Sequence, residues 1–184
     1  MTVSTIGHST HPIDEFMRML EAHGIQQLVD VRTIPKSRRN PQFSRENLPP
    51  SLQAVGIQYH HLPGLGGLRH PRKDSVNTGW RNASFRGYAD YMQTPEFGQS
   101  LEHLMELASQ VPTAIMCAEA VPWRCHRSLI ADALVARGVA VLDILSATKS
   151  QPHAMTPFAK VESERVWYPG QAASLDLPLF SPLE

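Results

Sequence analysis

Residues 113–145 have the sequence TAIMCAEAVPWRCHRSLIADALVARGVAVLDIL, and this stretch decides the fold. Thr113 to Cys117 is a short apolar run, which predicts a buried strand. Arg127 to Arg137 carries apolar residues at helical spacing, and Gly138 is well placed to end that helix. Val139 to Leu145 predicts another strand. Because parallel strands need a crossover, a strand–helix–strand unit predicts a parallel sheet covered by helices.

The same alternation runs through the rest of the chain. The predicted strands are Thr2–Ile6, Gln27–Thr33 and Ile57–Leu62, and the predicted helices begin at His11-Pro12, within Ser44–Val55, at Phe85 and at Thr94. We therefore expect an α/β fold of three layers, with a mostly parallel sheet of about five strands flanked by helices.

Two segments break this alternation. Pro63 to Ser84 is a long loop rich in Gly, Pro and polar residues, and loops of this length inside a compact domain are often functional. After Ser146 the chain is proline-rich and aperiodic. We interpret residues 1–184 as a single domain, in which an irregular C-terminal tail, residues 146–184, wraps the core through the anchors Trp167, Tyr168 and Phe180.

The composition is that of a globular protein. The chain has 184 residues, of which 42% are hydrophobic and 18% charged, so it is long enough to bury a core. No apolar run approaches the roughly 20 residues that cross a bilayer, so no membrane partner is expected. The N-terminus lacks the features of a signal peptide, and two cysteines do not suggest a disulfide scaffold. Together these features predict a cytoplasmic location.

The net charge of zero hides an uneven distribution along the chain. Between Val31 and Arg86, only Glu46 and Asp74 oppose a set of basic residues: Arg32, Lys36, Arg38, Arg39, Arg45, Arg69, Arg72, Lys73, Arg81 and Arg86. Because clustered positive charge attracts phosphates, this segment predicts an anionic small molecule or a nucleic acid as partner. The alternative is a solvated loop region whose charge is balanced by acidic helices nearby.

Polar residues follow the predicted strands at the point where each strand ends. They are Gly7-His8-Ser9, Asp30-Val31-Arg32, His60-His61 and Cys117-Ala118-Glu119. In open α/β sheets, ligands bind beyond the carboxyl ends of the strands. The sequence therefore predicts an active site at this edge of the sheet.

The segment 117–128 carries the most reactive chemistry of the chain. Cys117 precedes a helix N-terminus and several arginines, which favour the thiolate and hence a nucleophile or redox thiol. Cys125, His126 and Arg127 lie at or just before the first helical turn, where backbone N–H groups bind anions.

These residues predict a thiol-dependent transferase or hydrolase that acts on an anionic, phosphate-bearing substrate or a nucleic acid. The predicted catalytic residues are Cys117, Glu119, Cys125 and His126, with Glu119 or His126 as the proton-transfer partner. The predicted contacts to the anion are His8, Ser9, Asp30, Arg32, Ser37, Arg38, Gly66, Gly67 and Arg127, with Arg124 as a further charge.

Other interpretations stay open. A nucleic-acid-binding module without catalysis would use the basic segment 32–86 and its long loop. A metal-binding protein would use Cys117, Cys125 and His126, with His8 or Glu119 as a fourth ligand of the kind that zinc takes. Both thiols would be packing residues if they are simply buried. We predict no cofactor, and the metal is left open because the C-x7-C-H spacing matches no established zinc pattern.

The two halves of the chain resemble rhodanese-like domains. The resemblance rests on the helix and QLVDVR within residues 13–32, on Cys117 at a strand end, and on the later RGVAVLDI. It implies a sulfur-carrying or phosphate-handling cysteine at Cys117. Nine residues separate Cys117 from Arg127, more than the compact cradle of that family allows, so only the architecture is carried over.

A closer resemblance covers almost the whole chain. Its motifs are IGHST, DVRTIPKSRRNPQFS, YHHLPGLGG, FRGYADYM, CAEAVPWRCHRSLIAD and HAMTPFA. As a set they resemble a bacterial family of uncharacterised proteins, domain of unknown function 488. This resemblance implies membership of that family and no particular biochemical activity.

Overall fold

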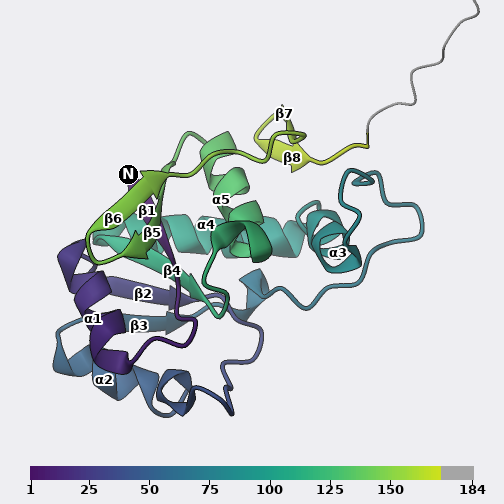
Figure 1. Ribbon diagram of the computed structural model, residues 1–184. Helices are drawn as coiled ribbons and strands as arrows, with labels where there is room; N and C mark the ends of the chain where they lie inside the picture. The colour runs from purple at the N-terminus through teal and green to yellow at the C-terminus, as the bar shows by residue number, and fades with distance from the viewer. Residues whose placement is uncertain (171–184) are drawn as a thin grey trace, which may run out of the picture.

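The computed structural model describes residues 1–170, and its centre is a six-stranded sheet in the order β3-β2-β4-β1-β5-β6 (Figure 1). The strands are β1 (Thr2–Gly7), β2 (Gln27–Asp30), β3 (Gln58–His61), β4 (Thr113–Cys117), β5 (Ala140–Ser146) and β6 (Lys149–Pro152). All pairs among β1 to β5 are parallel, and β6 pairs antiparallel with β5 at the edge of the sheet. The expected α/β fold with a mostly parallel sheet is confirmed, with one more strand than the sequence predicts.

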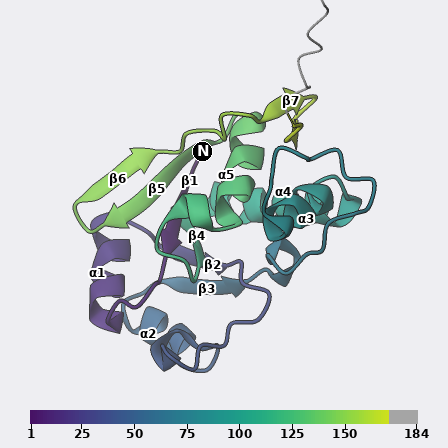
Figure 2. The same cartoon turned by 45° about the vertical axis from the view of Figure 1, so that its right-hand side comes forward.

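Helices cover both faces of this sheet and so give three layers (Figure 2). One face carries α1 (Ile13–Ala22) and α2 (Leu48–Ala54), and the other carries α3 (Ala83–Tyr91), α4 (Pro95–Gln110) and α5 (Arg127–Ala136). Because successive strand side chains point to opposite faces, Leu28 and Met116 pack with α1 and α2, whereas Val29 and Cys117 pack with α4 and α5. No helix within residues 1–170 has the length and apolar character needed to cross a membrane.

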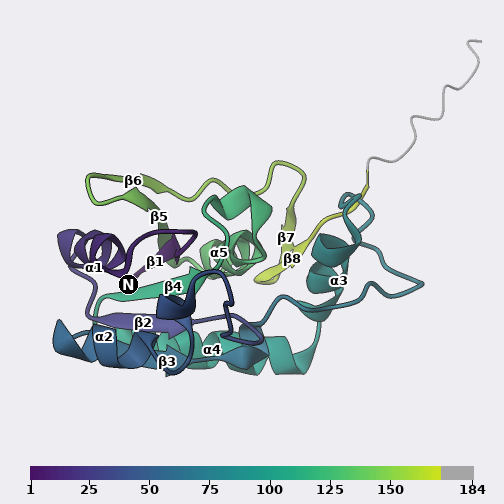
Figure 3. The same ribbon diagram turned by 60° about the horizontal axis from the view of Figure 1, so that its bottom comes forward.

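Three short strands lie within the segment that the sequence predicts as an irregular tail. Besides β6, they are β7 (Lys160–Glu162) and β8 (Arg165–Trp167), which pair with each other and lie beside α5 (Figure 3). Nearly all their side chains are exposed, so no hydrophobic alternation reveals them in the sequence. Of the predicted anchors, Tyr168 is fully buried, Trp167 is half-buried, and Phe180 lies outside the described residues.

The long loop between Pro63 and Ser84 is tied to α3 by a buried carboxylate. Asp90 accepts hydrogen bonds from the backbone N–H of Arg72 at 2.8 Å, the hydroxyl of Ser75 at 2.6 Å and the amide of Asn77 at 2.8 Å. Buried carboxylates of this kind need such partners, so the contacts fix the course of the loop. The loop is thereby held beside the carboxyl edge of the sheet.

Candidate functional site

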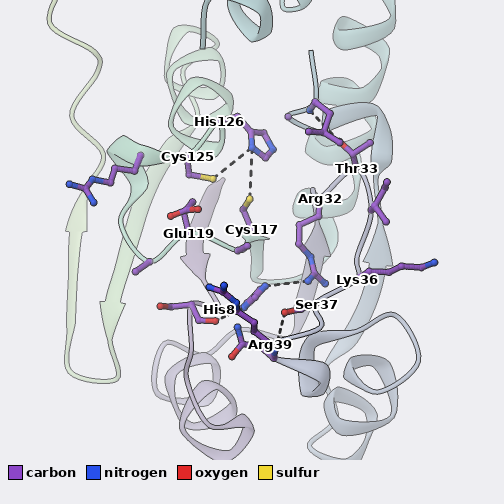
Figure 4. Close-up of a pocket in the computed structure, with 18 of the residues that line it drawn as sticks. His8, Arg32, Thr33, Lys36, Ser37, Arg39, Cys117, Glu119, Cys125 and His126 are labelled. Carbon is purple, nitrogen blue, oxygen red and sulfur yellow. Dashed lines mark hydrogen bonds between the residues drawn. The ribbon is translucent and has the colours of Figure 1, made fainter. Parts of the chain in front are cut away.

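A pocket of about 690 Å³ opens at the carboxyl edge of the sheet (Figure 4). Its walls are the segments that follow β1, β2 and β4, together with part of the long loop and the start of α3. The structure brings most of the predicted site residues onto these walls: His8, Ser9, Arg32, Ser37, Gly67, Cys117, Glu119, Cys125 and His126.

Cys117, Cys125 and His126 form a compact cluster on one wall (Figure 4). The Nδ1 atom of His126 lies 3.8 Å from the Sγ atom of Cys117 and 3.7 Å from that of Cys125. The Nε2 atom of the same ring lies 3.2 Å from the carbonyl oxygen of Val31. Because a carbonyl only accepts, Nε2 carries the proton and Nδ1 is the acceptor. The imidazole therefore presents a basic nitrogen to both thiols.

The position of the His126 ring depends on a glycine. A Cβ atom added at Gly67 would lie 2.5 Å from Nδ1 of His126, closer than real contacts allow. On another side the ring packs against Tyr88, with 5.0 Å between the ring centroids. The long loop therefore contributes to the site by leaving room for the imidazole.

The two thiols differ strongly in acidity. A hydrogen bond from the Cys125 thiol lowers the pKa of Cys117 to about 7, and the backbone N–H groups of Ala118 and Glu119 and the charge of Arg127 act in the same direction, against burial. The same contact and burial raise the pKa of Cys125 to about 12. Cys117 is therefore the thiol that ionises near neutral pH, while Cys125 stays protonated.

Arg32 and His8 line the pocket with polar atoms that are already paired. The Arg32 guanidinium donates to both carboxylate oxygens of Asp30, at 2.9 and 2.6 Å, and to the carbonyl of Phe43 at 2.8 Å. Its remaining terminal nitrogen lies 3.2 Å from Nε2 of His8, whose ring stacks on Phe43. Burial, together with the charge of Arg32, lowers the pKa of His8 to about 4. These residues shape the wall and add little net charge to it.

Arg127 takes a different position from the one that the sequence predicts. Its side chain is only 1% exposed and does not line the pocket. The guanidinium donates to the backbone carbonyls of Glu119 and Ala120, so it holds the loop that carries Cys125 instead of facing an anion. The other predicted contacts outside the pocket are Arg38, which is exposed, Gly66, which is buried, and Asp30, which pairs with Arg32.

Three exposed cations, Lys36, Arg39 and Arg124, line the pocket. Within residues 1–170 none of them makes an ion pair, and Glu119 is the only acid among the described residues of the pocket wall. Lys36 and Arg39 are not among the predicted contacts, whereas Arg38 between them is, because the sequence of an irregular segment does not show which side chains face a pocket. The pocket wall therefore carries a net positive charge.

The cysteine–histidine cluster could also hold a metal ion. Both Sγ atoms and Nδ1 of His126 lie within 4.8 Å of one another. Two thiolates and an imidazole are ligands that zinc accepts, and a carbonyl on the second ring nitrogen is the usual partner of a metal-bound histidine. These three residues would supply three of the four ligands that zinc usually takes.

The fold and the pocket together define an α/β protein with a cysteine–histidine cluster at the carboxyl edge of its sheet. The chain belongs to the family described as Domain of unknown function DUF488, whose model matches residues 12–134. This confirms the family that the sequence motifs indicate. No curated protein and no solved structure matches the chain, and the resemblance to rhodanese-like domains finds no support in these comparisons.

Proposed function

We propose that the pocket is the active site of a thiol-dependent enzyme in which Cys117 attacks a small anionic substrate. The observation that carries this proposal is the position of the Cys117 Sγ atom, 3.8 Å from an imidazole nitrogen that is able to accept its proton. A thiol nucleophile needs such a base, and the base needs a third group to orient it. The carbonyl of Val31 meets that need.

In this proposal His126, rather than Glu119, takes the proton from Cys117. The Glu119 side chain is exposed, and in the described residues it makes no hydrogen bond to either sulfur. The thiolate that forms is stabilised by the thiol of Cys125 and by the backbone N–H groups of Ala118 and Glu119. The cluster therefore has a nucleophile, a base and hydrogen-bond donors within reach of one another.

The charges on the pocket wall support an anionic substrate of small size. Lys36, Arg39 and Arg124 suit a carboxylate or a phosphate. The alternative of a nucleic-acid-binding module has less support, because other arginines of the basic segment are already engaged. Arg72 pairs with Asp74 at 2.8 Å, and Arg69 lies 3.5 Å over the ring of Tyr91.

The charge of the pocket is testable with two alkylating reagents of similar size. We expect Cys117 to prefer anionic iodoacetate over neutral iodoacetamide roughly tenfold more than a thiol in a short peptide does, because opposite charges attract in a pocket. Arg39→Ala should remove most of this preference, since Arg39 lines the pocket. Arg38→Ala is the matched control, because Arg38 is the next residue in the sequence and does not line the pocket. Equal effects of the two substitutions would argue against a substrate site at this wall.

A further inference from the structure

The nucleophile mechanism leaves one reactive group without a chemical step, the thiol of Cys125. Both cysteines line the pocket, and both are free thiols. Their Sγ atoms lie within 4.8 Å of each other, and both face Nδ1 of His126. Substitution at carbon or phosphorus needs a single nucleophilic thiol, so in that mechanism Cys125 only stabilises the Cys117 thiolate.

A second thiol can resolve a covalent intermediate only through attack on the sulfur of the first. Such an attack releases the bound group when that group is itself held by sulfur, because a disulfide sulfur is the electrophile in thiol–disulfide exchange. We propose, on the basis of the function proposed above, that Cys117 and Cys125 act as a dithiol that reduces a small anionic disulfide bound in this pocket.

The reaction balances in two exchanges. The Cys117 thiolate attacks one sulfur of the substrate disulfide, so that a mixed disulfide forms at Cys117 and the first substrate thiolate leaves with the proton that His126 had taken from Cys117. Cys125 then loses its proton to Nδ1 of His126 and attacks the Cys117 sulfur. The Cys117–Cys125 disulfide forms, and the second substrate thiolate leaves with the proton. Two electrons pass from the protein to the substrate, and a dithiol reductant must return them to close the cycle.

The architecture around the cluster fits this sequence of steps. Disulfide formation requires the two sulfurs to approach to about 2.05 Å with Cβ atoms about 3.8 Å apart, which demands thiols that already lie side by side. The first segment of the loop between them is held by Arg127 through two backbone carbonyls, and Cys125 accepts the backbone N–H of Arg127 at 3.5 Å. Lys36, Arg39 and Arg124 provide the positive charge that an anionic disulfide and its departing thiolates need.

The test uses 5,5′-dithiobis(2-nitrobenzoate), a disulfide that carries two carboxylates and releases a coloured thiolate. The native protein should release two thiolates per chain and end with a mass two hydrogens lower, without any adduct. Cys125→Ser should release one thiolate and keep the reagent on Cys117. Cys125→Ala serves as a second variant if Cys125→Ser does not fold. Cys117→Ser should no longer release the coloured thiolate rapidly. The neutral 2-hydroxyethyl disulfide is the control for charge. Arg39→Ala should slow the reaction with the dicarboxylate reagent and should leave the rate with the neutral disulfide unchanged.

The outcomes separate this inference from the proposed function. A native protein that releases one thiolate and keeps a stable adduct, as Cys125→Ser does, overturns the dithiol and leaves Cys117 as a nucleophile. A native protein that ends with an adduct on each cysteine also overturns the dithiol, because no disulfide has formed between Cys117 and Cys125. If the native protein releases nothing until it is unfolded, the dithiol and the nucleophile both fail.

Discussion

Replacing Asp30 by Asn is expected to lower the free energy of unfolding by about 3–5 kcal/mol, because it leaves a buried arginine without its counter-charge. Asp30 is fully buried, and Arg32 is 7% exposed. The carboxylate also accepts the Tyr59 hydroxyl at 2.9 Å and the backbone N–H of Arg32 at 3.0 Å. Urea unfolding followed by circular dichroism measures the change.

The matched control for this substitution is Asp74→Asn. Asp74 makes the same two-point contact with an arginine, Arg72, but both side chains are about two thirds exposed, at 70% and 67%. Exposed pairs contribute little to stability, because water and salt screen them, so the control should be nearly neutral. Similar losses for Asp30→Asn and Asp74→Asn would contradict the structural role assigned to the buried pair.

A second large effect is a loss of stability at alkaline pH that depends on His153. Its ring lies 3.0 Å from Asp132 and 3.2 Å from Asp143 and is 6% exposed. Burial lowers the pKa of His153, but the two carboxylates outweigh burial and raise it to about 9. The protonated ring therefore links β5, α5 and the segment after β6.

The sign of this effect follows from proton binding. Between pH 6.5, the ordinary value for histidine, and about pH 9, the folded protein holds a proton on His153 that the unfolded chain has released. The contribution to stability is complete below pH 6.5 and falls by about 1.4 kcal/mol per pH unit as pH rises, about 3 kcal/mol in total. His8 titrates below this range, because its pKa is lowered to about 4. Cys117 acts in the opposite direction between about pH 7 and pH 9, because its pKa is lowered from 9.0 to about 7, and it does so with or without His153.

Urea unfolding at a series of pH values tests this prediction, with His153→Gln as the comparison. The native protein should be more stable than the variant at pH 6.5, since Asp132 and Asp143 lose their shared cation in the variant. This difference in the free energy of unfolding should shrink by about 3 kcal/mol as pH rises to about 9. An identical decline in both proteins would show that another group is responsible.

The parallel core could be predicted because its signals are local. The apolar run from Thr113 to Cys117 is a buried strand, and Gly138 ends α5 in the left-handed region, with φ of +75°. β6 and β7 could not be predicted, because their side chains are exposed and their pairing depends on contacts with other parts of the chain.

The site was predictable to the extent that topology determines it. The carboxyl ends of β1, β2 and β4 meet at one edge of the sheet. The rule for open α/β sheets therefore predicts that His8, Arg32 and Cys117 lie close together, and all three line the pocket. The direction of individual side chains was not predictable. The spacing of residues does not show that the Arg127 side chain is buried against backbone carbonyls. Nor does it show that Arg39 lines the pocket and Arg38 does not.

If Cys117 is an activated thiol in a binding pocket, its alkylation rate as a function of pH should show it. Iodoacetamide labelling from about pH 5 to about pH 10, with mass spectrometry assigning each cysteine, gives both profiles. We predict a half-maximal rate for Cys117 near pH 7, and no labelling of Cys125 in the folded protein, because its pKa is about 12. Equal labelling with a midpoint near pH 9, the ordinary thiol value, would contradict the account. Two thiols that react only after the protein is unfolded would contradict it as well. Two thiols that react only after a chelator is added would do the same, because a bound metal would then occupy them.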